Sequence, residues 1–476
     1  IISIERLDLR GNFDMVLIGD DGENDLRSDS GDDRLEGGGG RDNIAGGAGD
    51  DTIIGGSGGG YFEPGTGSDE ITGNDGTDPD GTNEISYIFE TVRDASITAG
   101  IEVTFTSEFA GTIIDYAGDT DTFTGIQRVR GTSNDDTITG AEGDQQIWLF
   151  GGDDTIDLGA GDGDEISYTR VRGDFGATGG ADVDMETGIA IDPYGGTDTF
   201  SGVEEVTGSA FGDTLRGSTG DDELEGRDGD DLFEDRAGDD RVFGEGGDDT
   251  IISGTGVDTF DGGEGFDTYQ VDTAALGVPD GGYTLLIDVE AGTLGADLQD
   301  AADFDTITSI EAFDITAPEE VRVSFLGSAA NERATTGDGA DTLDGGGGVN
   351  TLTGGLGDDI YVHDGADGAV NAISDTGGTD RLVAIDGPGR DSGELIASGT
   401  ELVWRPFDGQ SEARVFGDGS GAFDVEFLTW QRPADNPEGL PASSVDLRIL
   451  TDPADVGSED FAFAETAGDD VLEIAK

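Results

Sequence analysis

Residues 37–54 read Gly37-Gly-Gly-Gly-Arg-Asp42-Asn-Ile44-Ala and Gly46-Gly-Ala-Gly-Asp-Asp51-Thr-Ile53-Ile, two nine-residue units in the same register. Each unit opens on glycines and carries an aspartate at its sixth position and an isoleucine at its eighth. Further units start at residues 19, 28, 55, 64 and 73 without a slip of register. Repetition at a short fixed period is typical of solenoids, in which each repeat is one structural unit that stacks on its neighbours.

A second uninterrupted run of such units covers residues 208–270. Its sixth position is aspartate in every unit, and its eighth is always aliphatic or aromatic. Shorter runs start at residues 131, 140 and 149, and again at 336, 345 and 354. Gln145 and Gly60 stand at sixth positions in place of a carboxylate. We expect these two positions to mark weakened or empty sites.

The residue pattern of the unit predicts a short strand and a tight turn. Its last three residues form a short strand, in which the eighth residue points inward and its two neighbours point outward. Glycines at the second and fourth positions allow backbone angles that a Cβ would forbid, so the first six residues form a tight turn. Since two units complete one coil, the sixth-position carboxylates of alternate units stack on one side. With turn carbonyls they offer the oxygen ligands, about six to eight, that Ca²⁺ prefers.

These units, of which Gly46 to Ile54 and Gly244 to Ile252 are examples, match the pattern G-G-x-G-x-D-x-U-x, where U is aliphatic. In this they resemble the hemolysin-type RTX family of calcium-binding repeat proteins, of the kind with several repeat blocks. The resemblance implies a parallel β-roll (β-solenoid) fold, extracellular Ca²⁺ binding and type I secretion.

The predicted metal ligands are mainly sixth-position side chains together with turn carbonyls. The side chains are Asn24, Asp33, Asp42, Asp51, Asp69, Asp136, Asp154, Asp164, Asp213, Asp222, Asp231, Asp240, Asp249, Asp258, Asp267, Asp341, Asn350 and Asp359. The carbonyls lie near Gly22, Gly31, Gly40, Gly49, Gly220, Gly229, Gly238, Gly247, Gly256, Gly348 and Gly357. Pairing between alternate units predicts roughly 14 Ca²⁺ ions at six to eight oxygens each. The aspartates at fifth positions are interpreted as solvated turn charges.

The composition narrows the classes of partner. The 476 residues include 107 Asp plus Glu and 23 Lys plus Arg, and the formal net charge is -84. This charge disfavours nucleic acid and anionic lipid as partners, and it needs a cation to offset its self-repulsion. Adaptation to high salt is an alternative explanation of the charge. It does not explain why the acidic residues recur at a fixed position of each unit.

The sequence lacks the residues for several other kinds of site. The chain has no cysteine, so a disulfide or thiolate site is impossible. His363 is the single histidine, which excludes an HExxH metalloprotease, and we expect it at a strand end or on the surface. We do not expect an enzyme. The sequence contains no run of 18 apolar residues, so it predicts no membrane span. The chain starts at Ile1 without a basic, apolar leader, so we expect a processed or excised piece.

The repeat runs alternate with spacers rich in Val, Ile, Thr, Phe and Tyr, which we expect to be strands. Two spacers share a plan, in which Ile85-Ser-Tyr87 and Ile166-Ser-Tyr168 each precede a Thr-Asp-Thr-Phe sequence. The predicted organisation is a first roll at 1–84, a spacer at 85–130, a short roll at 131–167, a spacer at 168–207, a third roll at 208–270, a spacer at 271–326 and a fourth roll at 327–379.

Residues 380–476 differ in character, with more proline and with Trp404 and Trp430. We expect a C-terminal antiparallel β cap here, because a roll exposes an edge that must be covered. A platform of the two tryptophans for sugar binding is possible, but packing in the cap is the favoured interpretation. The tail from Thr451 could hold an uncleaved secretion signal.

Three functions remain open. The favoured one is a secreted or cell-surface structural and adhesive module stiffened by calcium, with self-assembly or a cell-surface polysaccharide as the partner. The alternative is the calcium-dependent C-terminal region of a secreted lipase, protease, epimerase or cytolysin whose catalytic domain lies outside this chain. An ice- or glycan-binding solenoid would need a flat, regular threonine ladder, and the seventh position is threonine only intermittently.

Overall fold

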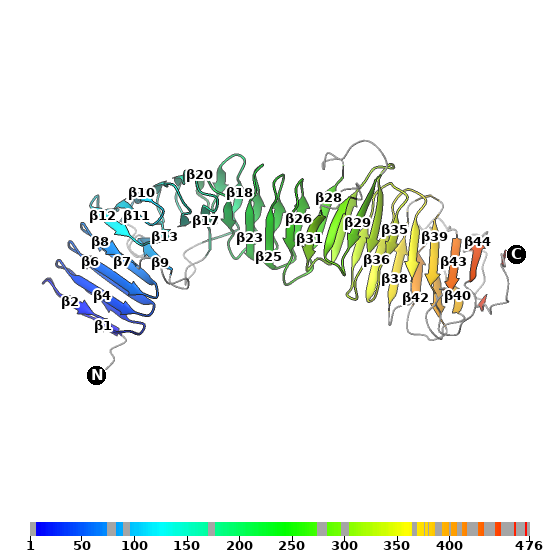
Figure 1. The fold of residues 1–476 in the computed structure, drawn as a ribbon, viewed down its shortest axis with the longest axis horizontal. Helices are drawn as coiled ribbons and strands as arrows, with labels where there is room; N and C mark the ends of the chain where they lie inside the picture. Colours follow the sequence, from blue (N-terminus) through cyan, green and yellow to red (C-terminus); the bar gives the residue numbers. More distant parts are fainter. Residues whose placement is uncertain are drawn as a thin grey trace. The chain divides into compact units, whose positions relative to one another are not determined.

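The computed structural model of the chain describes residues 6–73, 82–88, 96–169, 177–273, 283–296, 304–363, 369–375, 377–378 and 380–385, and the strands that follow them. The 46 elements named in these residues are all β-strands (Figure 1). The chain divides into two compact units. Unit 1 comprises residues 1–233 and 244–246, and unit 2 comprises residues 234–243 and 247–476. Most pairings in both units are parallel, which confirms the predicted parallel β-roll.

The repeat positions point as the two-residue period requires. In the strand Thr137–Thr139, for example, the eighth-position residue Ile138 is buried while both threonines are exposed. Eighth-position residues of alternate units then stack directly, so that Leu35 pairs with Ile53 and Ile53 with Ile71. All three are at most 1% exposed. Each such side chain contributes about 1.5 to 3 kcal/mol of burial, and the two columns that result form the core.

In unit 1 the first sheet, sheet A, is entirely parallel. Its strands, in order of pairing, are β1 (Arg6–Asp8), β3 (Asp25–Arg27), β5 (Asp42–Ala48), β7 (Gly60–Thr66), β9 (Asn83–Ser86), β13 (Arg128–Arg130), β15 (Gln146–Trp148), β17 (Glu165–Ser167), β21 (Glu205–Thr207) and β23 (Glu223–Asp228). The spacers at 85–130 and 168–207 therefore do not interrupt this sheet.

The second sheet of unit 1, sheet B, takes up the spacers as two antiparallel insertions. Its strands, in order of pairing, are β2 (Val16–Ile18), β4 (Arg34–Gly39), β6 (Thr52–Ser57), β8 (Glu70–Thr72), β12 (Thr120–Thr124), β11 (Ala110–Ile114), β10 (Glu102–Ser107), β14 (Thr137–Thr139), β16 (Thr155–Asp157), β20 (Thr197–Ser201), β19 (Ile189–Ile191), β18 (Asp182–Asp184) and β22 (Thr214–Arg216). In each insertion the last strand, β12 or β20, pairs with the preceding roll, and the first strand, β10 or β18, pairs with the following roll. We call these insertions meanders.

Unit 2 is also built from parallel strands, but each of its two sheets contains one meander. Its sheet A consists of β25 (Arg241–Gly246), β27 (Thr259–Asp261), β31 (Phe304–Thr308), β30 (Thr293–Ala296), β29 (Thr284–Asp288), β33 (Arg322–Leu326), β35 (Thr342–Asp344), β37 (Ile360–His363), β39 (Arg381–Ile385), β43 (Phe427–Arg432), β44 (Ser443–Arg448) and β46 (Leu472–Glu473). A third meander, β29 to β31, lies in this sheet. β24 (Leu232–Glu234) and β25 contain the boundary between the units.

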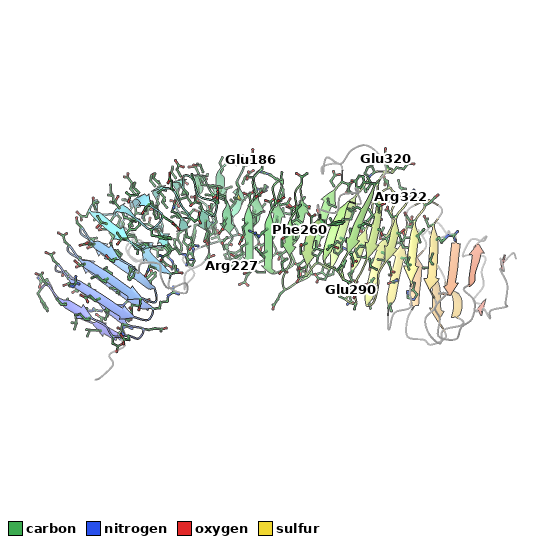
Figure 2. All side chains as sticks on the ribbon, in the orientation of Figure 1. Glu186, Arg227, Phe260, Glu290, Glu320 and Arg322 are labelled. Atoms are coloured by element: carbon green, nitrogen blue, oxygen red, sulfur yellow. The ribbon has the colours of Figure 1, made fainter. Side chains whose placement is uncertain are left out.

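Sheet B of unit 2 ends in a fourth meander. Its strands are β26 (Thr250–Ser253), β28 (Thr268–Asp272), β32 (Ala312–Thr316), β34 (Arg333–Thr335), β36 (Val349–Thr353), β38 (Val370–Ser374), β42 (Glu412–Phe416), β41 (Glu401–Pro406), β40 (Gly393–Ser398) and β45 (Phe461–Ala462). Phe260, labelled in Figure 2, is fully buried in this unit, and its ring lies 5.5 Å from that of Tyr269.

The C-terminal region contains the expected antiparallel pairs, β40 with β41, β41 with β42, and β43 with β44. Two parallel pairings, β39 with β43 and β38 with β42, join it to the roll. The side chains of Trp404 and Trp430, and nearly all of the tail from Thr451, lie outside the described residues. In the described part of the chain no helix has the length and apolarity to cross a bilayer.

His363 lies at a strand end, one of the two expected positions, but it is buried and not on the surface. This side chain is 1% exposed, and its Nδ1 atom lies 3.2 Å from the amide nitrogen of Asn371. His363 is the last residue of β37, and it pairs with Ala384 of β39 in parallel register. The roll continues past His363, which is why a residue expected at the end of the repeats is buried.

Buried tyrosines fasten the first two meanders to the roll. The hydroxyl of Tyr87 donates a hydrogen bond to Oδ2 of Asp121, and that of Tyr168 donates to Oδ2 of Asp198 at 3.0 Å. All four side chains are at most 2% exposed. The tyrosine comes from the start of the spacer and the aspartate from its Thr-Asp-Thr-Phe sequence. This contact explains why the two spacers share both sequences.

Replacement of Tyr87 by phenylalanine is expected to destabilise unit 1 by about 1 to 3 kcal/mol, because it removes the donor to a buried carboxylate. Urea unfolding at saturating calcium measures the change. A double-mutant cycle with Asp121→Asn serves as the control, because the loss from Tyr87→Phe should shrink once the carboxylate is gone. Equal losses in both backgrounds would show that the hydrogen bond is not the cause.

Candidate metal centre

The sixth-position side chains form a continuous row along the inside of each roll, which we call the inner ladder. The backbone N–H of Asp33 donates to Oδ1 of Asp51 at 2.8 Å, and that of Asp51 donates to Oδ1 of Asp69 at 2.7 Å. The backbone N–H of Asp341 donates in the same way to Oδ1 of Asp359, which lies 18 residues later in the sequence. One oxygen of each carboxylate is thus used to hold the next coil in register.

The structure places every predicted side-chain ligand in a buried position, and the most exposed of them, Asp222, is 5% exposed. In many rungs the second oxygen, Oδ2, is buried without a hydrogen-bond partner in the described part of the chain. These residues are Asp33, Asp42, Asp51, Asp69, Asp154, Asp164, Asp267, Asp341 and Asp359. We call them the open rungs. A buried carboxylate oxygen without a partner is costly, so each open rung calls for a cation or a proton.

Burial raises the pKa of several open rungs, and the charges of neighbouring carboxylates add to the rise. Burial raises the pKa of Asp51 to about 7, and the charge of Asp33 adds to the rise. Burial raises the pKa of Asp69 to about 8, with contributions from Asp121 and Asp51. Burial alone accounts for most of the rise at Asp42, whose pKa is about 6. Asp51 and Asp69 would therefore hold protons for a substantial part of the time near neutral pH unless a metal ion replaced them.

The turn backbone faces the same oxygens. A Cβ added to Gly37, a first-position glycine, would lie 2.1 Å from Oδ2 of Asp42 and 2.6 Å from the carbonyl oxygen of Gly55. Gly38 and Gly40, at the second and fourth positions of the same unit, have φ values of 107° and 76°, which only glycine adopts freely. Oxygens of two coils therefore converge at each turn, and this donor set of carboxylates and carbonyls fits Ca²⁺.

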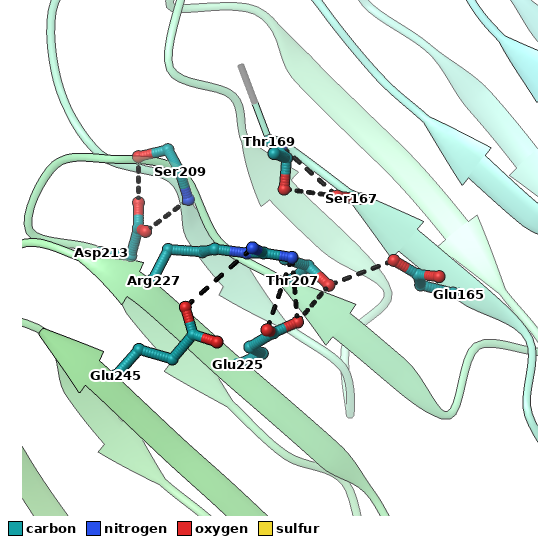
Figure 3. Close-up of polar contacts among 9 residues, drawn as sticks. All are labelled: Glu165, Ser167, Thr169, Thr207, Ser209, Asp213, Glu225, Arg227 and Glu245. Carbon is teal, nitrogen blue, oxygen red and sulfur yellow. Dashed lines mark hydrogen bonds and ion pairs between the residues drawn. The ribbon is translucent and has the colours of Figure 1, made fainter. Parts of the chain in front are cut away.

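Some rungs are closed by the protein itself. In the units that start at residues 131, 208 and 217, serine or threonine replaces the second-position glycine. Ser209 donates its N–H to Oδ2 of Asp213 at 2.6 Å and its hydroxyl to Oδ1 at 2.8 Å (Figure 3). Thr132 binds Asp136 in the same way, and Ser218 binds Asp222. Both oxygens of these three predicted ligands have donors, so their role in metal binding stays a prediction.

Amides close two further rungs. The side-chain nitrogen of Asn350 donates to the carbonyls of Gly345 and Gly347, both at 2.7 Å. That of Gln145 donates to the carbonyl of Gly143. The N–H groups lie where a cation would meet the turn carbonyls. The weak site expected at Gln145 and the role of Asn350 as a ligand both stay predictions.

At Gly60, a sixth position without a side chain, the rung is held by backbone alone. The N–H of Asp42 donates to the carbonyl of Gly59 at 3.4 Å, where other rungs use an aspartate. A side chain at Gly60 would lie 2.6 Å from the ring of Phe62. The large eighth residue takes the space, which agrees with an empty site.

The fifth-position aspartates form a second, outer ladder that the sequence did not predict. Oδ1 of Asp32 accepts the N–H of Asp50 at 3.0 Å, and Oδ1 of Asp50 accepts that of Ser68 at 2.9 Å. These carboxylates are exposed. They remain solvated turn charges, as expected, but they also hold successive coils together in the direction opposite to the inner ladder.

The inner ladder continues through the meanders, and these residues were missed. Oδ1 of Asp121 accepts the N–H of Asp69 at 2.8 Å, across 52 residues of sequence. Asp198 and Asp305 accept from Asp154 and Asp258 in the same way, both at 3.1 Å. Each of the three missed residues stands two before an apolar residue, as in the repeat itself. That spacing was the available signal.

The ladder of unit 2 also extends beyond its predicted end. Oδ1 of Asp380 accepts the N–H of Asp359 at 2.9 Å, and Asn371 contacts Asn350 at 3.0 Å. Both pairs are 21 residues apart instead of 18, because three extra residues follow Val362. The change of spacing hid two further units from a search at a period of nine.

Replacement of Asp33 and Asp51 together by alanine is expected to remove about one to two calcium equivalents from unit 1, because both belong to open rungs on one side of the first roll. Calorimetric titration of calcium measures the loss. The matched control is the double alanine variant of Asp32 and Asp50, the adjacent exposed pair, which should keep its calcium stoichiometry. Equal losses from both pairs would contradict the assignment of the inner ladder.

Comparison with known families agrees with this geometry. A family described as RTX calcium-binding nonapeptide repeat (4 copies) matches residues 27–62, 130–164, 207–234, 236–269 and 326–361. These segments cover both units and contain most of the open rungs. No curated protein matches the chain. The chain therefore carries RTX calcium-binding nonapeptide repeats in five segments between residues 27 and 361.

Proposed function

We propose that this chain is a secreted, non-catalytic RTX module that folds around calcium outside the cell and acts as an adhesive or structural surface. The observation that carries the adhesive part is an exposed threonine face on sheet B of unit 1. The open rungs support the calcium-driven part, because their buried carboxylate oxygens need a cation or a proton. Type I secretion and an extracellular location follow from the resemblance to RTX proteins and belong to the proposal.

Calcium concentration separates the two compartments in this proposal. Extracellular calcium modules bind with dissociation constants of about 10⁻⁴ to 10⁻³ M. In a cytosol with far less free calcium, the net charge of -84 and the glycine content of 86 residues would keep the chain unfolded. Outside the cell, bound ions stabilise only the folded state and so drive folding after export.

The threonine face arises where the meanders join the roll. Thr112 of β11 lies between Thr104 of β10 and Thr122 of β12 in the antiparallel register, and Thr104 also pairs with Thr139 of β14. All four point outward, and all but the half-buried Thr112 are exposed. A regular threonine ladder, which the seventh position alone does not provide, is thus supplied by the spacers.

A second row of the same face runs Thr137, Thr155 and Thr199 on β14, β16 and β20. All three are exposed. In a β-sheet, neighbouring positions are about 4.8 Å apart across strands and about 6.7 Å apart along a strand on one face, so the threonines recur at regular intervals. From β12 to β20, Glu102 and Asp157 are the charged residues among the outward positions. The face is nearly neutral in a strongly acidic chain.

Sheet A of the same unit presents a different surface. The hydroxyl of Thr207 donates to Glu165 at 3.1 Å and to Glu225 at 3.2 Å (Figure 3). Arg227 lies 3.4 Å from Glu225 and 4.0 Å from Glu245. Charged groups here are engaged with one another. The regular hydroxyls and methyls of sheet B are the better match for a neutral polysaccharide, whose own hydroxyls repeat at regular intervals.

Replacement of Thr104 and Thr122 by lysine is expected to weaken binding of the calcium-loaded chain to insoluble neutral polysaccharide by about tenfold or more, because it disrupts both shape and neutrality at the centre of the face. Co-sedimentation with cellulose and with chitin measures the effect. Asn43→Lys, on the exposed side of sheet A, is the matched control. Binding that is absent from the unaltered chain, or equal in all variants, would contradict the proposed adhesive surface.

A further inference from the structure

Two places in unit 2 bring three buried carboxylates together instead of two. One cluster comprises Asp235, Asp240 and Asp258, and the other comprises Asp359, Asp375 and Asp380. Within each cluster one oxygen from each residue lies within 4.8 Å of the others. All six side chains are at most 3% exposed. The third carboxylate comes from outside the pattern of the repeat.

Asp235 stands at the first position of its nine-residue unit, where the other units of the third roll have glycine or serine. A first-position side chain has little choice of direction, because at Gly37 the space of a Cβ adjoins Oδ2 of the sixth-position residue, Asp42. An aspartate at this position therefore directs its carboxylate toward the sixth-position carboxylates. The unit of Asp235 has Asp240 at its sixth position, and Asp258 follows two units later.

The contacts of Asp235 leave one oxygen for a ligand. Its Oδ1 accepts the N–H of Gly254 at 2.5 Å. Its Oδ2 is buried without a hydrogen-bond partner in the described residues, and the side chain as a whole is 0% exposed. Burial, together with the charges of Asp258 and Asp240, raises the pKa of Asp235 to about 8. An oxygen so placed among two other carboxylates fits a cation.

The second cluster has the same arrangement at the extended end of the ladder. Asp375 is at the first position of a unit that has Asp380 at its sixth, and Asp359 is the sixth-position residue of the same side one coil earlier. Oδ2 of Asp359 has no hydrogen-bond partner in the described residues, and this side chain is 0% exposed. Tyr361 donates its hydroxyl to Oδ2 of Asp375, so one tyrosine borders this cluster.

We propose that these two clusters are the tightest calcium sites of unit 2, and that Asp235 and Asp375 make them so by replacing a turn residue with a third carboxylate. The affinity of a calcium site rises with the number of charged ligands. The two sites fill first as calcium rises, before the two-carboxylate open rungs. The inference rests on the proposed calcium-driven folding and adds an order of filling to it.

The test is calcium titration of the full chain with Asp235→Gly and Asp375→Gly combined. Glycine is the usual residue at the first position, so the variant retains two carboxylates at each site. We expect the two tightest calcium equivalents to weaken by about tenfold or more, with the weaker equivalents unchanged. Asp235→Asn with Asp375→Asn, which keeps the size of the side chains, should give the same loss.

Asp239→Asn with Asp358→Asn is the matched control, since these exposed fifth-position residues carry the same charge in the same roll. Unchanged tight equivalents in the glycine variant, or an equal loss in the control, would overturn the inference while total calcium binding persisted. A chain that bound no calcium in any form would remove the proposed function as well. The two failures are therefore distinguishable by the stoichiometry of the unaltered chain.

Discussion

Chelation of calcium is expected to abolish most of the β structure of both units. Two carboxylates about 4.8 Å apart repel by about 3 to 4 kcal/mol at an effective dielectric constant of about 20. Within the clusters of Asp235 and Asp359 the carboxylate oxygens lie within 4.8 Å of one another. Open rungs recur along each roll, so the unfavourable terms accumulate. Their sum is large against the 5 to 15 kcal/mol or so by which a folded domain is usually stable.

Circular dichroism with calcium, and then with a chelator in excess, measures this loss. Magnesium is the informative control, because it keeps its waters and demands a tighter octahedral shell than these turns provide. Sodium at the same ionic strength controls for screening. A spectrum that survives chelation, or one that magnesium and sodium restore equally well, would favour adaptation to salt over specific calcium binding.

The repeat units made the roll predictable because their information is local. The eighth position marks the core, as Leu35 and Ile53 show, and the sixth position marks the buried carboxylates. Both follow from a fixed period and from the alternation of a strand. Neither depends on residues far away in the sequence.

How the spacer strands pair within the sheets could not be predicted from the same local information. β12 pairs with β8 across a segment that contains β9 to β11, and only this pairing shows that Asp121 follows Asp69 in the ladder. Each meander also reverses its own strand order when it enters the sheet. Such non-local pairings carry no periodic signal, although the repeated Asp-x-apolar spacing was present in the sequence.

The state of each rung was likewise missed, for a different reason. Whether a sixth-position carboxylate is open depends on the second residue of its unit, where glycine leaves Asp42 open and serine closes Asp213. A consensus pattern treats these units as equivalent. The hydrogen-bond inventory of serine and threonine, read at that position, would have separated them. The predicted total of roughly 14 ions therefore counts several closed rungs.

Acidification without calcium is expected to restore part of the β structure. Burial raises the pKa of Asp69 to about 8 and that of Asp51 to about 7, whereas an unfolded aspartate has a pKa of about 3.9. A group whose pKa is higher in the folded state favours folding when it is protonated. That contribution is complete below the unfolded pKa of about 3.9 and is lost as the pH rises through about 7 to 8.

The calcium-free chain should therefore be largely unfolded at pH 8 and gain β structure as the pH falls toward 5, because protons replace the cations between stacked carboxylates. With calcium at subsaturating concentration the direction reverses, since protons then compete with the metal for the same oxygens and raise the calcium midpoint. Circular dichroism across this pH range, with and without calcium, measures both trends. Asp51→Asn with Asp69→Asn, which mimics the protonated pair, should lessen the pH dependence of unit 1. If the spectrum of the calcium-free chain stayed constant between pH 8 and 5, repulsion between buried carboxylates would not be the cause of its unfolding.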